Sequence, residues 1–352
     1  MRMQRVRLNQ QPFQFQTIQE LPQGRDLAAG IVEAGGTRGY LPGHLTRQSN
    51  SIHRGIPMAA TDIASSATSW KQPAPRRRAE LLRFPHALWR QRELWWKLSR
   101  REVQGRYRGS MLGWGWSLIT PLLMLAVYNF VFSQVFRARW GDLQEGGPLV
   151  FAINLFAGLI VFNVFAETAN QSPTLILNNA NLVTKVIFPL EVLPAVSVAA
   201  ALFHALTSLV VLMGFLLVNG LLAGSGLGLP ATLLWLPLVW LPMLSGCLAL
   251  GWLLAALGVF LRDLNQVIGV AVNLLMFLSA VFYPLSALPE RWQPLLQLNP
   301  MVLVIEQTRR VAVAGEMPTL AYLGWGSVLG LVVCELGFRA FQKARRGFAD
   351  VL

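Results

Sequence analysis

The chain has 352 residues, of which 54% are hydrophobic and only 13% are charged. A soluble globular domain carries about a quarter charged residues, so this composition favours a membrane protein over a soluble one. The net charge of +13 could indicate a nucleic-acid partner. Most of the excess positive charge, however, lies before the first long apolar run and after the last one. That placement is typical of the cytoplasmic flanks of membrane spans, and we expect no nucleic-acid partner.

Residues 1–83 are rich in Gln, Arg, Gly, Ser and Ala and show little periodicity. This composition predicts a disordered N-terminal extension. The segment lacks the apolar core of a secretory signal. Met58 offers an alternative start of the chain, and we expect no function for the extension. Residues 84–352 are predicted to form a single transmembrane domain.

A basic, Trp-rich segment at 88–104 predicts a helix that lies at the membrane surface. At helical spacing Arg90, Glu93 and Lys97 share a face, and aromatic and aliphatic residues occupy the remainder. Such a helix would turn its aromatic side toward acyl chains and its basic side toward head groups or a partner. A simple topology anchor explains the pattern equally well. The candidate interfacial residues are Arg92, Trp95, Trp96, Lys97, Arg100 and Arg101.

Six segments reach the length of about 20 mostly apolar residues that a bilayer crossing needs. They are 116–136, 149–169, 190–218, 232–260, 267–285 and 320–341. An even number of spans places both ends of the chain on the same side. Basic residues at the C-terminal end, such as Lys343 and Arg345, match the basic N-terminal segment, so both termini are expected to be cytoplasmic. The predicted fold class is an all-α integral membrane protein with six transmembrane helices.

The stretch 283–318 between the fifth and sixth spans contains five prolines, and its apolar pieces 295–298 and 301–305 are too short to cross a bilayer. They could form two re-entrant gate helices that dip into the outer leaflet, which requires protein or a wet cavity around them. An ordinary external loop with a surface helix is the alternative.

Signatures of catalysis are missing from the sequence. No Lys follows a Gly, so the P-loop signature cannot occur, and there is no H-E-x-x-H pattern. Two acidic residues fall at membrane depth, where an acid is a functional candidate by default. Glu335 lies one helical turn from Arg339, which favours a structural ion pair, and Glu167 is expected to reach head groups. We therefore predict no catalytic residue and no metal site.

Aromatic residues recur every fourth position on the first predicted span and therefore share a face. If that face lines a pore, its rings could stack against sugars. Packing between helices or against lipid is the alternative role for any single ring. The pore and gate candidates are Tyr128, Phe132, Phe136, Phe282, Tyr283 and Pro300.

Four stretches together resemble a known family. They are the basic segment 92–113, the loop NNANLVTKVIFPLEVLP at 178–194, the proline-rich segment 283–300 and the C-terminal RGFADVL at 346–352. In this order they are similar to the permease subunits of ABC-2 type polysaccharide exporters, the group that moves O-antigen, capsular polysaccharide and teichoic acid. The resemblance extends over roughly 88–352, and the extension before it is not included.

The resemblance implies a role for each stretch. A coupling helix with Asn178, Asn179, Asn181 and Lys185 would dock into a separate ABC ATPase, which binds ATP and Mg, so the permease itself would bind no cofactor. The interfacial helix would also touch the ATPase and control access from the head-group layer. The proline-rich segment would form gate helices at the pore exit. A homodimer, surrounded by membrane lipids, would carry a lipid-linked polysaccharide across the inner membrane.

Three alternatives remain at this point. An ABC-2 permease for drugs or lipids shares the architecture, although the long proline-rich segment and the Phe348-Ala349-Asp350 ending favour a glycan exporter by resemblance. A membrane-embedded glycan-processing enzyme would need clustered acids or histidines on one side of the membrane. A scaffold without transport would not need Pro121 and Pro194 inside spans.

Overall fold

The computed structural model describes residues 83–135, 148–184, 188–223 and 229–351. All of them belong to one compact unit, Pro75–Leu352. The predicted disorder of 1–83 therefore lies almost wholly outside the described residues. Within the described ranges every regular element is a helix, which confirms the all-α prediction.

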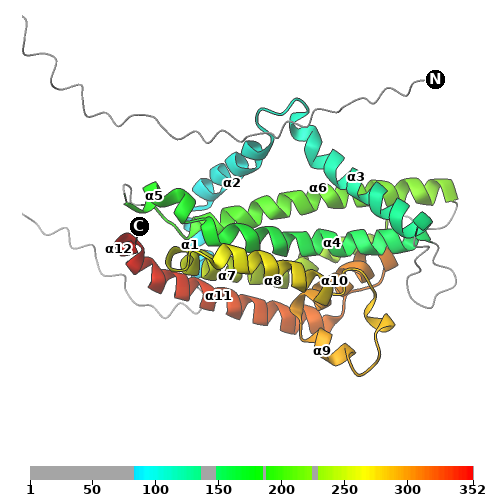
Figure 1. Ribbon diagram of the computed structural model, residues 1–352. Coiled ribbons are helices and arrows are strands. Elements are labelled where there is room, and N and C mark those ends of the chain that lie inside the picture. The colour runs from blue at the N-terminus through cyan, green and yellow to red at the C-terminus, as the bar shows by residue number, and fades with distance from the viewer. Residues whose placement is uncertain (1–82, 136–147, 185–187, 224–228, 352) are drawn as a thin grey trace, which may run out of the picture. The chain divides into compact units, whose positions relative to one another are not determined.

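The helices follow one another along the chain as Figure 1 shows. They are α1 (Phe84–Arg90), α2 (Arg92–Tyr107), α3 (Trp116–Phe130), α4 (Pro148–Gln171), α5 (Ala180–Thr184), α6 (Val192–Ala223), α7 (Leu236–Phe260), α8 (Leu264–Leu278), α9 (Gln293–Gln297), α10 (Pro300–Arg309), α11 (Ser327–Ala344) and α12 (Phe348–Val351). Short π-helical segments continue α3 through Val131–Val135 and α10 through Arg310–Ala314, and a third, Tyr322–Gly326, leads into α11.

Four helical stretches of the described chain are long and apolar enough to cross a membrane. They are Val150–Thr174, Val192–Val218, Ala231–Phe260 and Tyr322–Gly347, and they correspond to the second, third, fourth and sixth predicted spans. The first predicted span corresponds to α3 and its π-helical continuation, whose description stops at Val135, so Phe136 lies outside the described residues. The fifth corresponds to α8, an apolar helix of 15 residues.

The expected end of the fifth span at residue 285 is wrong, because α8 stops at Leu278. Ala280 adopts a left-handed backbone with φ +51°, which an α-helix cannot contain. Pro284 has no N–H to bond the Ala280 carbonyl, and it disfavours helical geometry at the residue before it. The chain therefore leaves the helix here, although its side chains remain apolar.

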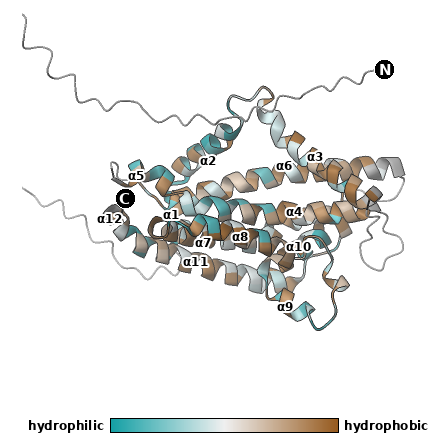
Figure 2. Ribbon diagram, in the orientation of Figure 1, coloured by the Kyte–Doolittle hydropathy of each residue, from teal (hydrophilic) through white to brown (hydrophobic). Residues whose placement is uncertain are grey.

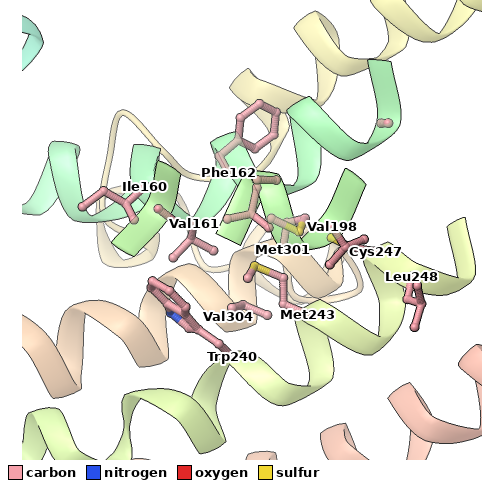
Figure 3. Packing of buried hydrophobic residues seen from close by; sticks show 14 of the residues in the cluster. Ile160, Val161, Phe162, Val198, Trp240, Met243, Cys247, Leu248, Met301 and Val304 are labelled. Carbon is pink, nitrogen blue, oxygen red and sulfur yellow. The ribbon is translucent and has the colours of Figure 1, made fainter. Parts of the chain in front are cut away.

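The core lies where α4, α6, α7 and α10 meet (Figure 3), with Phe162, Val198, Met243 and Val304 among its buried residues. α11 packs closely on α7. A Cβ at Gly337 would lie 2.9 Å from the Ala249 Cα, so glycine allows the two backbones to approach, as small residues do between membrane helices.

The faces of α3 and α8 that point away from this core are apolar and exposed. Leu122 and Phe130 on α3 are 54% and 62% exposed, and Leu274 on α8 is 59% exposed. Figure 2 shows hydrophobic residues along the long helices and more hydrophilic ones on α2 and α5. In water such surfaces would be unfavourable, whereas lipid or a partner helix accommodates them.

The proline-rich segment forms α9 and α10, and α10 is mostly buried against α4 and α7. Its start follows a strong local signal: the side chain of Asn299 accepts a hydrogen bond from the Met301 N–H at 3.0 Å, and Pro300 occupies the first turn. The alternative of an external loop with a surface helix therefore does not describe α10, because protein surrounds it. α9 is short and lies mostly exposed.

Candidate functional site

Two elements singled out by the sequence, the basic segment and the Asn-rich loop, line one cavity. It has a volume of about 1190 Å³ and lies between α2, α5 and the beginning of α6; we call it the α2–α5 cavity. Figure 1 shows α2 and α5 toward the same end of the helices, near the C-terminus. The polar residues along its wall include Arg101, Arg106, Arg108, Gln171, Asn178 and Asn181.

The Asn-rich loop is a short helical segment, as the coupling-helix prediction requires. A 3₁₀ turn, Leu177–Asn179, leads into α5, and Asn178 and Asn181 are exposed. The Asn179 side-chain amide donates to the Leu175 carbonyl at 2.9 Å and so stabilises the turn rather than facing outward. Lys185 lies outside the described residues. Docking of an ATPase at this loop stays a prediction.

The C-terminal segment makes hydrogen bonds to the residues that directly follow the Asn-rich loop. Arg345 donates to the Glu191 carboxylate and to the Phe188 carbonyl, each at 2.8 Å. Phe348 is fully buried and packs edge-on against Phe341. Arg345, just before the ending that resembles the family's C-terminus, thus holds the loop's exit, and Phe348 of that ending packs on Phe260 of α7 and Phe341 of α11.

The helix predicted at 88–104 is interrupted and longer than expected. It breaks at Gln91, whose backbone leaves helical geometry with ψ 17°, and α2 then continues to Tyr107. The orientation predicted for its aromatic side is wrong for Trp95, whose indole N–H donates to the Ala195 carbonyl at 3.0 Å. Ala195 lies in the first turn of α6, so α6 supplies the acceptor for the indole. Trp96 is 63% exposed, and the basic candidates Arg92, Lys97, Arg100 and Arg101 are exposed; their contact with head groups or a partner stays a prediction.

Arg106 at the end of α2 joins a charged cluster that the sequence analysis did not find. Its guanidinium lies 2.6 Å from the Glu167 carboxylate on α4, and the His204 Nδ1 on α6 lies 3.0 Å from the same carboxylate. Glu167 is thus paired within the protein, and the expectation that it reaches head groups is wrong. Burial raises the pKa of neighbouring Tyr107, with Arg106 opposing this effect and Glu167 adding to it.

A second cavity of about 630 Å³ lies beyond this cluster, between α3, α4 and α6; we call it the α3–α4 cavity. Asn163, Glu167 and Asn170 stand at helical spacing along its α4 wall. Asn163 and Asn170 are exposed. Two side-chain amides and one carboxylate on one face of an otherwise apolar helix make this wall suitable for a hydrated or hydroxyl-rich solute.

The predicted pore aromatics do not gather in one place. Tyr128 lines the α3–α4 cavity. Phe132 instead stacks on Phe151 with ring centroids 4.9 Å apart, and Phe282 stacks on Phe277 at 5.4 Å. The Tyr283 hydroxyl donates to the Phe277 carbonyl. Pro300 lines a separate apolar groove between α7, α10 and α11, and Phe136 lies outside the described residues.

A buried charge on α10 also escaped the sequence analysis. Arg309 is 4% exposed and donates to the carbonyls of Asn154, Ala280 and Val281 at 3.0, 3.0 and 2.7 Å. It thus holds the residues after α8 against α4. A Cβ at Gly158 would lie 2.7 Å from its guanidinium, so the glycine makes room for it. Arg309 was overlooked because it stood in a segment interpreted as a connection between spans.

The predicted pair of Glu335 and Arg339 is confirmed, with Arg339 Nε 2.6 Å from the carboxylate. The other oxygen of Glu335 accepts the backbone N–H groups of Arg83 and Phe84 at 2.7 and 3.1 Å. This carboxylate therefore satisfies free donors at the start of α1, and α1 is held to α11.

Comparison with known proteins places these features in a family. The family described as "ABC-2 type transporter" matches residues 93–312. An O-antigen export system permease protein of Myxococcus xanthus is 29% identical over 77% of this chain and 99% of its own length. One from Klebsiella pneumoniae is 25% identical over 72% and 93%, respectively. A polysialic acid transport protein of Escherichia coli is 23% identical over 69% and 90%.

Proposed function

The chain belongs to the ABC-2 type transporter family, and we propose that it is the membrane permease of an ATP-driven polysaccharide exporter. Family membership makes it a transporter subunit rather than an enzyme and implies an ABC ATPase as its partner, as the sequence predicted. The observation that carries the choice of cargo is the similarity to O-antigen permeases over nearly their entire length. The alternatives of a drug or lipid permease and of a scaffold have no comparable support.

The orientation follows from the distribution of charge. The end that carries α2, α5 and the C-terminal residues Arg345 and Arg346 is rich in basic side chains. The positive-inside rule places that end in the cytoplasm, so the ATPase would meet α5 and α2 there. Six spans, counting α3 and α8 with the four long helices, then bring both termini to the cytoplasmic side.

The transport unit is a homodimer in this proposal. The exposed apolar faces of α3 and α8 and the polar α4 wall of the α3–α4 cavity would face the second copy, which encloses the path. A lipid-linked O-antigen or capsule-like glycan would enter from the cytoplasmic leaflet. Movement of α5 by the ATPase would be transmitted to the helices through the contacts of Arg345 with Glu191 and Phe188. α9 and α10 would border the exit.

Deletion of the gene, followed by complementation, tests the function. The deletion strain should lose its long surface polysaccharide and accumulate lipid-linked glycan inside, and the wild-type chain should restore export. A chain with Asn181→Asp and Lys185→Glu should insert normally but export at least tenfold less, because acidic side chains alter the surface offered to the ATPase. Normal surface glycan in the deletion strain would refute the proposed cargo. Normal export by the double variant would refute the coupling assignment.

A further inference from the structure

The Arg106–Glu167–His204 cluster lies at a defined depth in the helices. Glu167 follows the first residue of α4 by a helix length of roughly 28 Å at 1.5 Å per residue, and His204 precedes the last residue of α6 by the same length. In the stretches long and apolar enough to cross a membrane, Glu167 lies seven residues before the end of Val150–Thr174, and His204 lies twelve residues after the start of Val192–Val218. The cluster therefore lies inside the spans, on the side of α2 and α5.

The cluster also stands between the two cavities. Arg106 and Tyr107 line both the α2–α5 cavity and the α3–α4 cavity, whereas Glu167 and His204 line only the second. The end of α2 is thus a partition with the basic cavity on one side and the polar α4 wall on the other. The pair of Arg106 with Glu167 fixes that partition to α4.

The α2–α5 cavity favours an anion. Arg101, Arg106 and Arg108 line it, against one carboxylate, Glu102. Guanidinium groups bind phosphate through paired, charge-assisted hydrogen bonds. Tyr107 and Trp114 add aromatic surface beside these charges, which suits a ligand with an apolar or sugar portion next to its phosphate.

Arg106 and Glu167 can exchange partners at a small cost in free energy. Arg106 is 34% exposed on its side chain, so a ligand in the α2–α5 cavity can reach it. A phosphate accepts the same pair of guanidinium hydrogen bonds as a carboxylate. If Arg106 turns to a phosphate, Glu167 keeps His204 at 3.0 Å and Gln171, whose side-chain amide donates to it at 3.2 Å. The carboxylate is therefore not left without a partner, which would be costly.

We propose that the Arg106–Glu167–His204 cluster is a latch that a phosphate-bearing lipid head group opens by taking Arg106 from Glu167. The head group binds in the α2–α5 cavity, the end of α2 separates from α4, and the two cavities join. This inference rests on the proposed function in one respect, since it names the chemical group of the cargo that the permease first recognises. In the proposed cargo, the group that binds Arg106 is the phosphate of the lipid carrier.

Binding of geranylgeranyl diphosphate to the full chain in phosphatidylcholine nanodiscs tests the latch. Arg106→Gln should weaken binding at least tenfold, because charge-assisted hydrogen bonds are lost. Glu167→Gln should tighten it three- to tenfold, because the ligand no longer competes with a carboxylate. The double variant should bind like Arg106→Gln. Arg262→Gln, which removes an exposed charge between α7 and α8 outside the cavity, is the control and should change binding less than twofold.

Competitors identify the source of the phosphate. Geranylgeraniol, which has no phosphate, should not displace the labelled probe. Inorganic pyrophosphate at the same concentration should displace little of it, and full displacement would overturn the lipid head group as the ligand. Unchanged or weaker binding by Glu167→Gln would overturn the latch itself.

Opening is measured separately with a cysteine at Thr207, which lines the α3–α4 cavity. The native Cys247 and Cys334 are buried, so a charged thiol reagent should report on Thr207→Cys. Its reaction rate should rise at least fivefold on addition of geranylgeranyl diphosphate, and Glu167→Gln should raise it without ligand. An unchanged rate in both cases refutes opening. If this pattern holds in a chain that exports no glycan, the latch stands and the proposed function falls.

Discussion

Arg309 and Arg106 are two membrane-depth arginines in opposite situations. Arg309 is 4% exposed, and three backbone carbonyls from α4 and the end of α8 accept its hydrogen bonds. Arg106 is one-third exposed, and its partner is the side-chain carboxylate of Glu167. Backbone carbonyls cannot move without moving the main chain, whereas a side-chain carboxylate can exchange its partner. One arginine therefore fixes the residues after α8 to α4, and in our proposal the other allows α2 to separate.

Substitution of Arg309 by Met is expected to have the largest effect on stability. It removes the donor of the Ala280 and Val281 carbonyls, which lie outside helices, at about 1–3 kcal/mol for each group that finds no substitute, and also the additional hydrogen bond to the Asn154 carbonyl of α4. The free energy of unfolding in detergent, followed by SDS titration, should fall by about 3 kcal/mol or more. Arg106→Gln, treated in the same way, should lose far less. Equal losses would break the distinction between the two arginines.

Gly158→Ala should weaken the same exit-side anchor with a single methyl group. The new Cβ would lie 2.7 Å from the Arg309 guanidinium and 3.3 Å from Ile305. The arginine must shift, and we expect a loss of about 1–3 kcal/mol, as for other overpacked cores. Gly214→Ala on α6 is the control, because nothing lies within 4 Å of its Cβ. Thermal unfolding of the purified chains should separate the two variants, and similar melting points would contradict the role of Gly158.

Trp95→Phe tests how strongly α2 is held to α6. The change removes the indole N–H that donates to the Ala195 carbonyl while keeping an aromatic ring. We expect a loss of about 1 kcal/mol and faster proteolysis of the 90–108 segment. Trp96→Phe, at a side chain 63% exposed, should leave proteolysis unchanged. If the two variants behave alike, α2 is not held to α6 through Trp95.

Arg345→Lys should have the smallest effect on stability and a selective effect on transport. Lysine can keep the charge pair with Glu191 but cannot also donate to the Phe188 carbonyl in the forked geometry of arginine. The loss should be about 0.5 kcal/mol. ATP hydrolysis by the assembled exporter should continue, while glycan export per ATP falls. A parallel decline of both rates would argue against a role in coupling.

Much of the fold followed from local sequence. Long, mostly apolar runs predicted α4, α6, α7 and α11, because hydropathy and length are properties of a segment by itself. The pairing of Glu335 with Arg339 was predictable for the same reason, since the two residues lie one helical turn apart. α8 ends where it does because of Pro284 and the left-handed backbone of Ala280. The side chains after Leu278 are still apolar, so hydropathy did not predict this end.

The candidate site was only partly predictable. Sequence alone marked the basic segment and the Asn-rich loop, because polar residues beside apolar spans stand out locally. It could not show that both line one cavity. It also could not pair Arg106 with Glu167 and His204, residues that lie far apart in the chain. The aromatic pattern was misleading, because rings at helical spacing pack with neighbouring rings as readily as they line a path.

The sequence by itself therefore determined the membrane class, the four long spans and the resemblance to the family, since each rests on composition or spacing within one segment. The tertiary structure decided which charges are partners, where α8 ends, and that Trp95 faces α6 rather than lipid. The physical reason is that a charge or an indole N–H at membrane depth must find a partner nearby in space. That partner is supplied by whichever helix packs there, at any distance along the chain.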